Sequence, residues 1–215
     1  MNCIVTAGPT YEPLDAVRRL TNFSTGKLGV ELANHLTDQG HVVTLLLGEA
    51  ATYAGARRAA RVQAFTTTAS LGERLQALGG DNIQAVFHAA AVSDFAFGKV
   101  WQHTSGGDLT IVQAGKFGTR AGGFLVELLP TPKIIVQLRG WFPRARLAGW
   151  KYEVDGGRAE VLSAARRQLA EANSDLCVAN GPAYGPGFGL VTRDMDRSVA
   201  DAAGLYVELE KFACQ

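Results

Sequence analysis

The chain has 215 residues, of which 47% are hydrophobic and 19% are charged, and its formal net charge at pH 7 is +1. This composition supplies a sizeable core and excludes an intrinsically disordered chain, while the balanced charge argues against nucleic acid as a partner. No apolar run reaches the roughly 18 residues of a membrane span, and the N-terminus lacks the basic region of a signal peptide.

Short apolar runs alternate with amphipathic stretches, and this alternation predicts parallel strands joined by helices. In the first half of the chain the pattern predicts strands at 3–6, 41–47, 61–65 and 85–91, and helices at 24–39 and 67–78. In the second half it predicts helices at 132–141 and 158–172, strands at 146–149 and 175–179, and a final antiparallel hairpin of 190–192 with 205–209.

Residues 95–129 break this rhythm, because they are rich in Gly, Thr and Ser and have no helical period. We expect a hairpin-like β flap at about 96–129, in which 109–112 and 124–128 are strands and 115–123 is the loop between them. The whole chain, 1–215, is then a single α/β domain with a mainly parallel sheet and an inserted flap.

Glycine is over-represented, with 25 residues against the roughly 15 of an average chain of this length. Two glycine-containing segments suit an anion. We expect residues 6–10 (TAGPT) to form a turn after the first strand, where backbone N–H groups approach phosphate oxygens. An ordinary turn without a ligand is the alternative.

Residues 21–29 (TNFSTGKLG) bring hydroxyls, a Lys and glycines to a helix start, which also suits an anion. The alternative there is N-capping by Ser24 alone.

Three further segments carry polar groups at strand ends or in the flap. Residues 88–95 (HAAAVSDF) suit a flat ligand beside Asp94, or else tight sheet packing and a turn Asp. His88 alone is more typical of an interior histidine than of a catalyst. Lys116 and Arg120 suit a flap that closes over a polyphosphate, or else are solvated loop cations. Trp150 and Lys151 suit base stacking and phosphate binding, or else a core Trp followed by a surface charge.

The three cysteines, Cys3, Cys177 and Cys214, are far apart and lack the spacing of a structural zinc site. Cys3 and Cys177 lie in apolar runs, which predicts buried thiols. A reducing cytoplasm fits this cysteine usage best.

Taken in chain order, the motifs resemble the phosphopantothenate–cysteine ligase family. The resemblance rests on TAGPTYEPLDAVR (6–18), LTNFSTGKLG (20–29), AAVSDF (90–95), KFGT (116–119), LPTPKII (129–135) and DLCVAN (175–180). It implies a Rossmann-like three-layer α/β sandwich, a homodimer, and a ligase of coenzyme A biosynthesis. A nucleoside triphosphate, CTP or ATP with Mg²⁺, would activate the carboxylate of 4′-phosphopantothenate. The amine of cysteine would then form the amide.

The resemblance also implies roles for individual residues. Asn22 would orient the acyl intermediate, and Lys116 would close with the flap and stabilise charge; these are the expected catalytic residues. The expected nucleotide site contains Gly8, Ala90, Ala91, Asp94, Pro132, Trp150 and Lys151, and the expected substrate site contains Asn22, Ser24, Thr25 and Gly26. No residue is expected to be a metal ligand. Because the chain begins at the ligase motif, the resemblance implies the monofunctional type, without a flavin.

Several features leave alternatives open. Pro9 replaces a glycine of the family pattern, the expected Lys positions of the penultimate helix hold Gln168 and Ala172 beside Arg166 and Arg167, and Gly181 replaces an Asp. CTP and ATP therefore both stay open. An NAD(P)-binding oxidoreductase is the second hypothesis, although GxGxxG and Tyr-x-x-x-Lys are missing. A non-catalytic nucleotide-binding homologue is the third.

Overall fold

The structure, a computed structural model, describes residues 1–79, 82–104, 106–118 and 122–214. Its strands are β1 (Asn2–Ala7), β2 (Tyr11–Pro13), β3 (Arg19–Thr21), β4 (Val42–Gly48), β5 (Arg61–Phe65), β6 (Ala85–His88), β7 (Phe95–His103), β8 (Leu109–Ile111), β9 (Phe124–Pro130), β10 (Arg146–Tyr152), β11 (Leu176–Asn180), β12 (Phe188–Val191) and β13 (Asp196–Val199). Its helices are α1 (Lys27–Asp38), α2 (Thr68–Ala77), α3 (Ile134–Trp141), α4 (Arg158–Ala172) and α5 (Ala202–Cys214).

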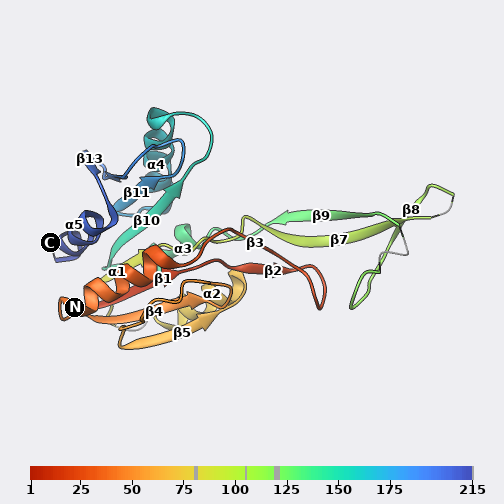
Figure 1. The fold of residues 1–215 in the computed structure, drawn as a ribbon, viewed down its shortest axis with the longest axis horizontal. Coiled ribbons are helices and arrows are strands. Elements are labelled where there is room, and N and C mark those ends of the chain that lie inside the picture. The colour runs from red at the N-terminus through yellow and green to blue at the C-terminus, as the bar shows by residue number, and fades with distance from the viewer. Residues whose placement is uncertain (80–81, 105, 119–121, 215) are drawn as a thin grey trace.

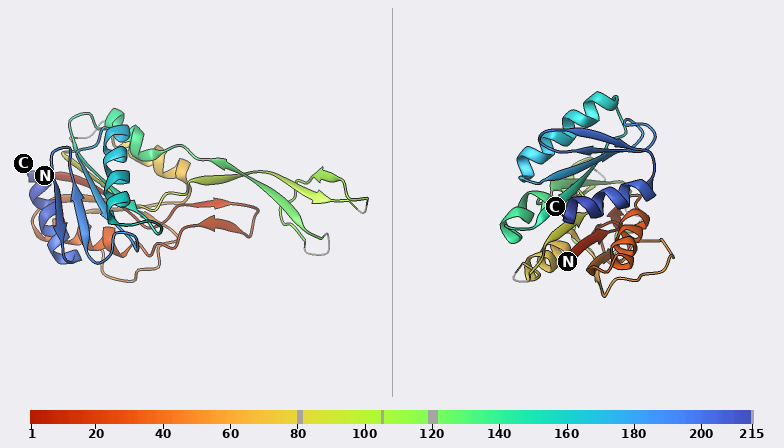
Figure 2. Two further views of the ribbon diagram at one scale, coloured as in Figure 1. Left: turned by 90° about the horizontal axis from the view of Figure 1, so that it is seen from above. Right: turned by 90° about the vertical axis from the view of Figure 1, so that its left-hand side faces the viewer.

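The body is a twisted sheet covered by helices on both faces (Figures 1 and 2). The strand order is β13-β12-β11-β10-β6-β1-β4-β5, and the ladders from β11 to β5 are parallel, whereas β12 and β13 pair antiparallel. This arrangement confirms the predicted α/β class with a mainly parallel sheet, and it has the three layers that the family resemblance implied.

Strand β1 lies inside the sheet and is buried on both faces, as parallel strands are. Cys3, Val5 and Ala7 pack into the core cluster shared with α1 and α5, whereas Ile4 packs into the cluster shared with α2 and α3. This alternation follows from the period of two residues in a strand. The apolar run at the N-terminus therefore contributes side chains to the core clusters on both faces of the sheet.

The inserted segment forms an arm that projects from the body (Figures 1 and 2). Its strand order is β8-β7-β9, so the two strands expected at 109–112 and 124–128 do not pair with each other. Both pair instead with β7, a strand that we did not predict because Gly98 and polar residues interrupt its apolar pattern. Residues 119–121 of the expected 115–123 loop lie outside the described residues.

The final hairpin that we expected, of 190–192 with 205–209, is wrong because its second segment is not a strand. Strand β12 pairs with β13, and residues 205–209 belong to α5. Leu205 and Leu209 are four residues apart and both buried, which is helical spacing. The strand expected at 85–91 ends at His88, and β2 and β3 form a hairpin that we did not predict.

The remaining expected elements are confirmed within a few residues of their ends, and two other expectations also hold. Cys3 and Cys177 are buried free thiols. Within the described part of the chain, no helix combines the length and apolar character needed to cross a bilayer.

Helix α1 packs with its backbone directly against β1 at Gly29, which has no side chain. A Cβ added at Gly29 would lie 2.6 Å from the Cβ of Ala7 and 3.0 Å from the carbonyl oxygen of Thr6. Real Cβ atoms do not approach a neighbouring carbon this closely, so the helix or the strand would have to move.

We therefore predict that Gly29→Ala lowers the free energy of unfolding by about 1–3 kcal/mol through overpacking. Gly140→Ala is the matched control, because Gly140 lies in α3 and an added Cβ there meets nothing within 4 Å; helix propensity should raise stability by up to about 1 kcal/mol. Denaturant unfolding measures both variants. Equal stabilities for the two variants would contradict the close-packing argument.

Candidate functional site

A cleft of about 1000 Å³ opens at the carboxyl ends of β6, β10 and β11. It lies beside the boundary between β1 and β6, where the chain order reverses: β4 and β5 continue on one side of β1, and β6 starts the other side. Ligands of open α/β sheets bind at such a switch point. The cleft is lined mainly by residues 22–29, 88–94, 131–135 and 150–152.

Asn22 is fixed against the end of β6. Its side-chain amide nitrogen donates to the backbone carbonyls of Ala91 and Val92, each at 3.2 Å. The backbone N–H of Ala91 in turn donates to the carbonyl of Gly8 at 3.0 Å. The turn after β1, the end of β6 and Asn22 are therefore one hydrogen-bonded unit.

The N-terminus of α1 opens into this cleft. Gly26 is the N-cap residue with φ of +81° and makes no side-chain cap, so N-capping by Ser24 is wrong. Thr25 Oγ1 accepts a hydrogen bond from the N–H of Lys27, the first helical residue, at 3.2 Å. The next N–H groups of the helix and its positive dipole end are then presented to an anion.

His88 lies in the floor of the cleft and is buried. Its Nδ1 lies 3.0 Å from Thr6 Oγ1, and the N–H of Ala90 donates to the same hydroxyl at 3.0 Å. Burial lowers the pKa of His88 to about 4, so the ring is neutral at pH 7. The interpretation of His88 as an interior histidine is confirmed, and its role is to hold the alanine segment in place.

An ion pair that the sequence did not predict stands at the mouth of the cleft. Lys133 Nζ lies 2.5 Å from Asp94 Oδ1, and about two thirds of each side chain is exposed. The loop that carries Asp94 is fixed because Thr131 donates its N–H to the Asp94 carbonyl at 3.0 Å. Exposed pairs contribute only about 0–1 kcal/mol, so a ligand phosphate can recruit Lys133 at little cost.

Two buried polar atoms in the wall of the cleft have no hydrogen-bond partner among the described residues. They are Trp150 Nε1, a donor at the end of β10, and Asn180 Oδ1, an acceptor at the end of β11. A buried polar group left unpaired costs about 1–3 kcal/mol. Buried polar atoms in a ligand-sized cleft therefore point to a polar ligand that supplies the missing partners.

The structure brings most of the predicted site residues together. Ala90, Ala91, Asp94, Pro132, Trp150 and Lys151 line the same cleft as Asn22, Ser24, Thr25 and Gly26. Gly8 shapes the turn behind the cleft and is not part of its lining; its φ is +80°. The sequence did not assign Phe23, Lys133, Gln168 or Asn180, although all four line the cleft. Phe23 is fully exposed, which the residue type alone does not indicate.

Lys116 lies elsewhere, beside the tip of the β2–β3 hairpin. The carbonyl of Gly115 accepts from the N–H of Ala16 at 2.9 Å, and the N–H of Phe117 donates to Asp15 Oδ2 at 3.2 Å. The Arg18 guanidinium, hydrogen-bonded to Asp15, holds the pKa of that carboxyl well below its usual range. Lys116 is thus held at this place outside the cleft lining of its own chain.

The other basic residues that we considered for a triphosphate do not reach the cleft either. Arg166 pairs with Asp196, and Arg167 donates to Ser163 on its own helix. From α4 it is Gln168 that lines the cleft, and its amide nitrogen donates to the carbonyl of Trp150 at 3.2 Å. Arg120 lies outside the described residues.

Comparison with known proteins gives consistent matches. The family model described as DNA/pantothenate metabolism flavoprotein C-terminal domain matches residues 1–211. The coenzyme A biosynthesis bifunctional protein CoaBC of Thermococcus kodakarensis is 36% identical over 179 residues, which cover 82% of this chain and 40% of that protein. The chain spans about two fifths of the length of this relative and of the CoaBC protein of Bacillus subtilis.

Solved structures share the fold. The DNA/pantothenate metabolism flavoprotein of Streptococcus pneumoniae has a TM-score of 0.84 at 25% identity, with 100% of this chain and 99% of that chain covered. A mutant of Cab2 in complex with phosphopantothenate-cysteine has a TM-score of 0.70 at 18% identity, with 99% and 87% covered. The second likeness is one of fold alone.

The buried His88 makes a pH-dependent contribution to stability. The unfolded chain binds a proton at this ring below about pH 6.5, whereas the folded protein does so only below about pH 4. The unfolded state is therefore favoured as the pH falls through this window, and stability is lost. We predict that this loss is roughly 3 kcal/mol between pH 7 and pH 4, and that His88→Gln removes it. Chemical denaturation of both proteins across this range measures the difference; identical pH slopes would refute it.

Proposed function

The chain belongs to the family of the DNA/pantothenate metabolism flavoprotein C-terminal domain, and we propose that it is a phosphopantothenate–cysteine ligase of coenzyme A biosynthesis. The observation that carries the proposal is one cleft that joins Asn22, the open N-terminus of α1 and the 90–94 segment. Its relatives named for coenzyme A biosynthesis support the same activity.

In the first half-reaction, a carboxylate oxygen of 4′-phosphopantothenate attacks the α-phosphorus of CTP or ATP. The bond from the α-phosphorus to the bridging oxygen breaks, and pyrophosphate leaves with both bonding electrons. Negative charge moves onto pyrophosphate in this step, so stabilisation depends on preorganised donors and cations rather than on a strong base. The N–H groups of α1 and the ammonium groups of Lys27, Lys133 and Lys151, which line the cleft, can supply it.

In the second half-reaction, the cysteine amine attacks the carbonyl carbon of the acyl-nucleotidyl intermediate. The bond from the carbonyl carbon to the phosphate oxygen breaks, the nucleoside monophosphate leaves with its electrons, and the amine releases one proton to solvent as the amide forms. We assign Asn22 to orientation of the intermediate, because two hydrogen bonds hold its side chain at the junction of the 90–94 segment and α1. Holding the two reactants in place is itself a large part of such catalysis.

The nucleotide would lie along β6 and β10. The alanines 89–91 leave room for a flat base, and Trp150 Nε1 and Asn180 Oδ1 offer it a donor and an acceptor. Mg²⁺, which usually keeps several waters and needs few protein ligands, neutralises triphosphate charge when bound. Asp94 is the accessible carboxylate of the cleft for Mg²⁺, since Glu31 already accepts hydrogen bonds from Tyr53 and Tyr206.

We propose the cytoplasm as the compartment of the protein, because the three cysteines are free.

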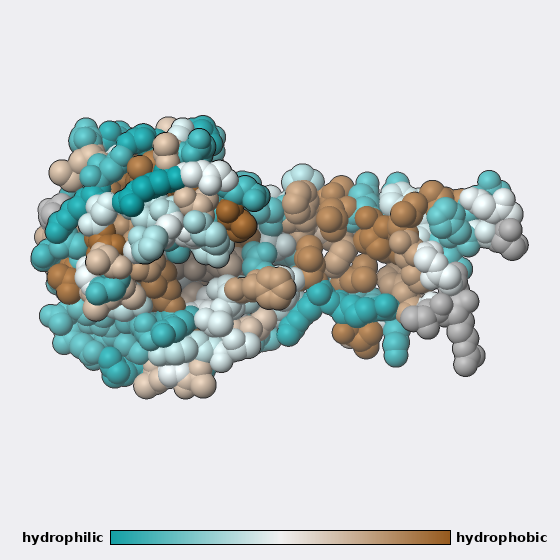
Figure 3. Space-filling view, turned by 45° about the horizontal axis from the view of Figure 1, so that its top comes forward, coloured by the Kyte–Doolittle hydropathy of each residue, from teal (hydrophilic) through white to brown (hydrophobic). Residues whose placement is uncertain are grey.

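A homodimer accounts for the projecting arm. Apolar side chains gather on the face of the arm seen in Figure 3. Across the arm strands, nearly half or more of each of the following side chains is exposed: Phe95, Leu109, Ile111, Leu125, Leu128 and Leu129. A monomer rarely leaves so much apolar surface uncovered, and a second copy related by a two-fold axis covers it on both chains at once.

The same dimer explains the position of Lys116. Because its loop is tied to Asp15 and Ala16 away from the cleft of its own chain, we propose that Lys116 acts in the cleft of the partner. A cation supplied from an arm completes the charge stabilisation only after the partner has bound.

We predict pyrophosphate release that depends on 4′-phosphopantothenate, cysteine, Mg²⁺ and either CTP or ATP. Asn22→Ala should lower kcat by about 10²–10³-fold, because the acyl group loses its orienting contact. Asn82→Ala is the matched control. Asn82 is exposed and precedes the amino end of β6, whereas the cleft lies at the carboxyl end of that strand. Folded wild-type protein that releases no pyrophosphate with either nucleotide would favour a non-catalytic homologue.

Heterodimers test the arm. A purified heterodimer of Asn22→Ala with Lys116→Gln should recover about half of the wild-type activity, because action in trans leaves one of two sites intact. A heterodimer of the double variant with wild type should be nearly inactive, since each site then carries one defect. The reversed pattern would show that Lys116 acts within its own chain. Failure of tagged copies to associate at all would refute the homodimer.

A further inference from the structure

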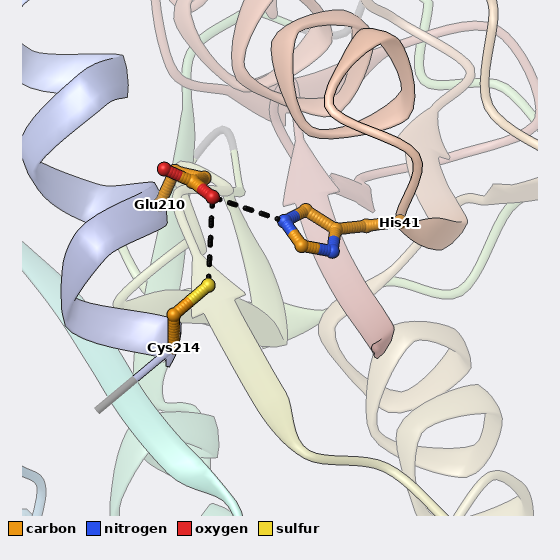
Figure 4. Close-up of side chains that lie close together, drawn as sticks. All are labelled: His41, Glu210 and Cys214. Atoms are coloured by element: carbon orange, nitrogen blue, oxygen red, sulfur yellow. Dashed lines mark hydrogen bonds and ion pairs between the residues drawn. The ribbon is translucent and has the colours of Figure 1, made fainter.

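A second cluster of polar side chains lies at the other end of the sheet. His41 precedes β4 at the amino end of that strand, whereas the cleft lies at the carboxyl ends of the strands. Glu210 and Cys214 are one turn apart on α5, and their side chains point toward His41 (Figure 4). His41 lies 169 positions before Glu210 in the sequence, so the fold brings it to the pair on α5.

The two distances from Glu210 to the other ligand atoms match those of a coordination sphere. Glu210 Oε1 lies 3.4 Å from His41 Nε2 and 3.4 Å from Cys214 Sγ, and all three atoms lie within 4.8 Å of one another. Ligand bonds of about 2.0–2.3 Å at tetrahedral angles separate ligand atoms by about 3.3–3.8 Å. An ion placed among these atoms therefore needs little movement of the backbone.

The donor set selects the kind of ion. A thiolate, an imidazole nitrogen and a carboxylate oxygen are the ligands of Zn²⁺, whereas Mg²⁺ and Ca²⁺ prefer oxygen ligands alone. One thiolate, one carboxylate and a neutral imidazole balance the charge of a divalent ion. From this geometry we propose that His41, Glu210 and Cys214 bind one zinc ion.

The surroundings of the cluster support a preorganised site with an open approach. The neighbouring face of α5 is anchored in the core by Leu205, Leu209 and Ala213, so the helix holds its two ligands at a fixed i, i+4 spacing. The side chains of His41 and Glu210 are mostly buried, whereas Cys214 is exposed and leaves a path for the ion. Binding forms Zn–N, Zn–O and Zn–S bonds and releases the thiol proton to solvent. A water molecule would complete the tetrahedron.

The ion would tie the last helix to the start of β4. Without the ion, the side chains of Glu210 and His41 are joined by a single contact of 3.4 Å between Oε1 and Nε2. A ligand that binds the folded state alone stabilises that state, so zinc raises the unfolding temperature of the protein. This role does not depend on the ligase activity proposed above.

Cobalt is the probe for this site. The full chain, free of any affinity tag and stripped with a chelator, is titrated with Co²⁺. We expect one equivalent to bind with a thiolate charge-transfer band and the intense visible bands of a tetrahedral site, and Zn²⁺ to displace it. Cys214→Ser should abolish the charge-transfer band, and His41→Gln and Glu210→Gln should each weaken Co²⁺ binding at least about tenfold.

Controls distinguish this site from non-specific binding. Two substitutions should leave the spectrum unchanged: His103→Gln, at an exposed histidine on the arm, and Cys177→Ala, at a buried thiol. Thermal unfolding provides a second readout: Zn²⁺ should raise the midpoint of the wild type and not that of Cys214→Ser. A folded wild type without the thiolate band, or a band that persists in Cys214→Ser, would overturn the proposal.

Discussion

The close contact between α1 and β1 is the constraint on which the cleft depends. Gly29 allows the helix backbone to approach Ala7 and Thr6, and this approach fixes where the helix begins. Because β1 also borders β6 at the switch point of the sheet, the helix start and the end of β6 face the same opening. A larger residue at position 29 would separate these two walls as well as loosen the core.

The cleft combines fixed backbone donors with ionisable side chains that are buried or already paired. Lys27 Nζ lies 3.8 Å from Glu31 Oε1, and Lys151 Nζ lies 3.0 Å from Glu153 Oε1. Burial keeps His88 neutral, and the exposed pair of Asp94 and Lys133 is weak and easily rearranged. The open N-terminus of α1 supplies fixed N–H groups. Such a cleft is suited to reactions in which phosphate charge must be stabilised and reactants oriented, and it offers little for proton abstraction at a carbon atom.

The sequence predicted the parallel core well because apolar periodicity reports burial directly. The runs that became β1, β4 and α4 are long and regular, so their positions could be read from spacing alone. The arm could not be predicted, since β7 is a half-exposed strand interrupted by Gly98 and its pairing depends on long-range register. The motif residues of the cleft were found because they are contiguous. Lys133 lies in the 129–135 motif and Gln168 at an expected Lys position, but a motif does not show which of its side chains face the cleft, so neither was assigned to the site. The cluster of His41, Glu210 and Cys214 was not predicted, because a search by local spacing finds only ligands that are close together in the sequence.

Helix α5 runs from the cleft to the cluster with His41. Ala202 and Tyr206, near its start, line the cleft, and the Tyr206 hydroxyl donates to Glu31 of α1 at 2.9 Å. Glu210 and Cys214, one and two turns further on, belong to the cluster with His41. A helix is stiff over so short a length. A bound ion that holds the C-terminal part of α5 in place would therefore also hold Tyr206 in place in the cleft. An ion held by His41, Glu210 and Cys214 would therefore stabilise the wall of the cleft from outside it, without contacting the ligand.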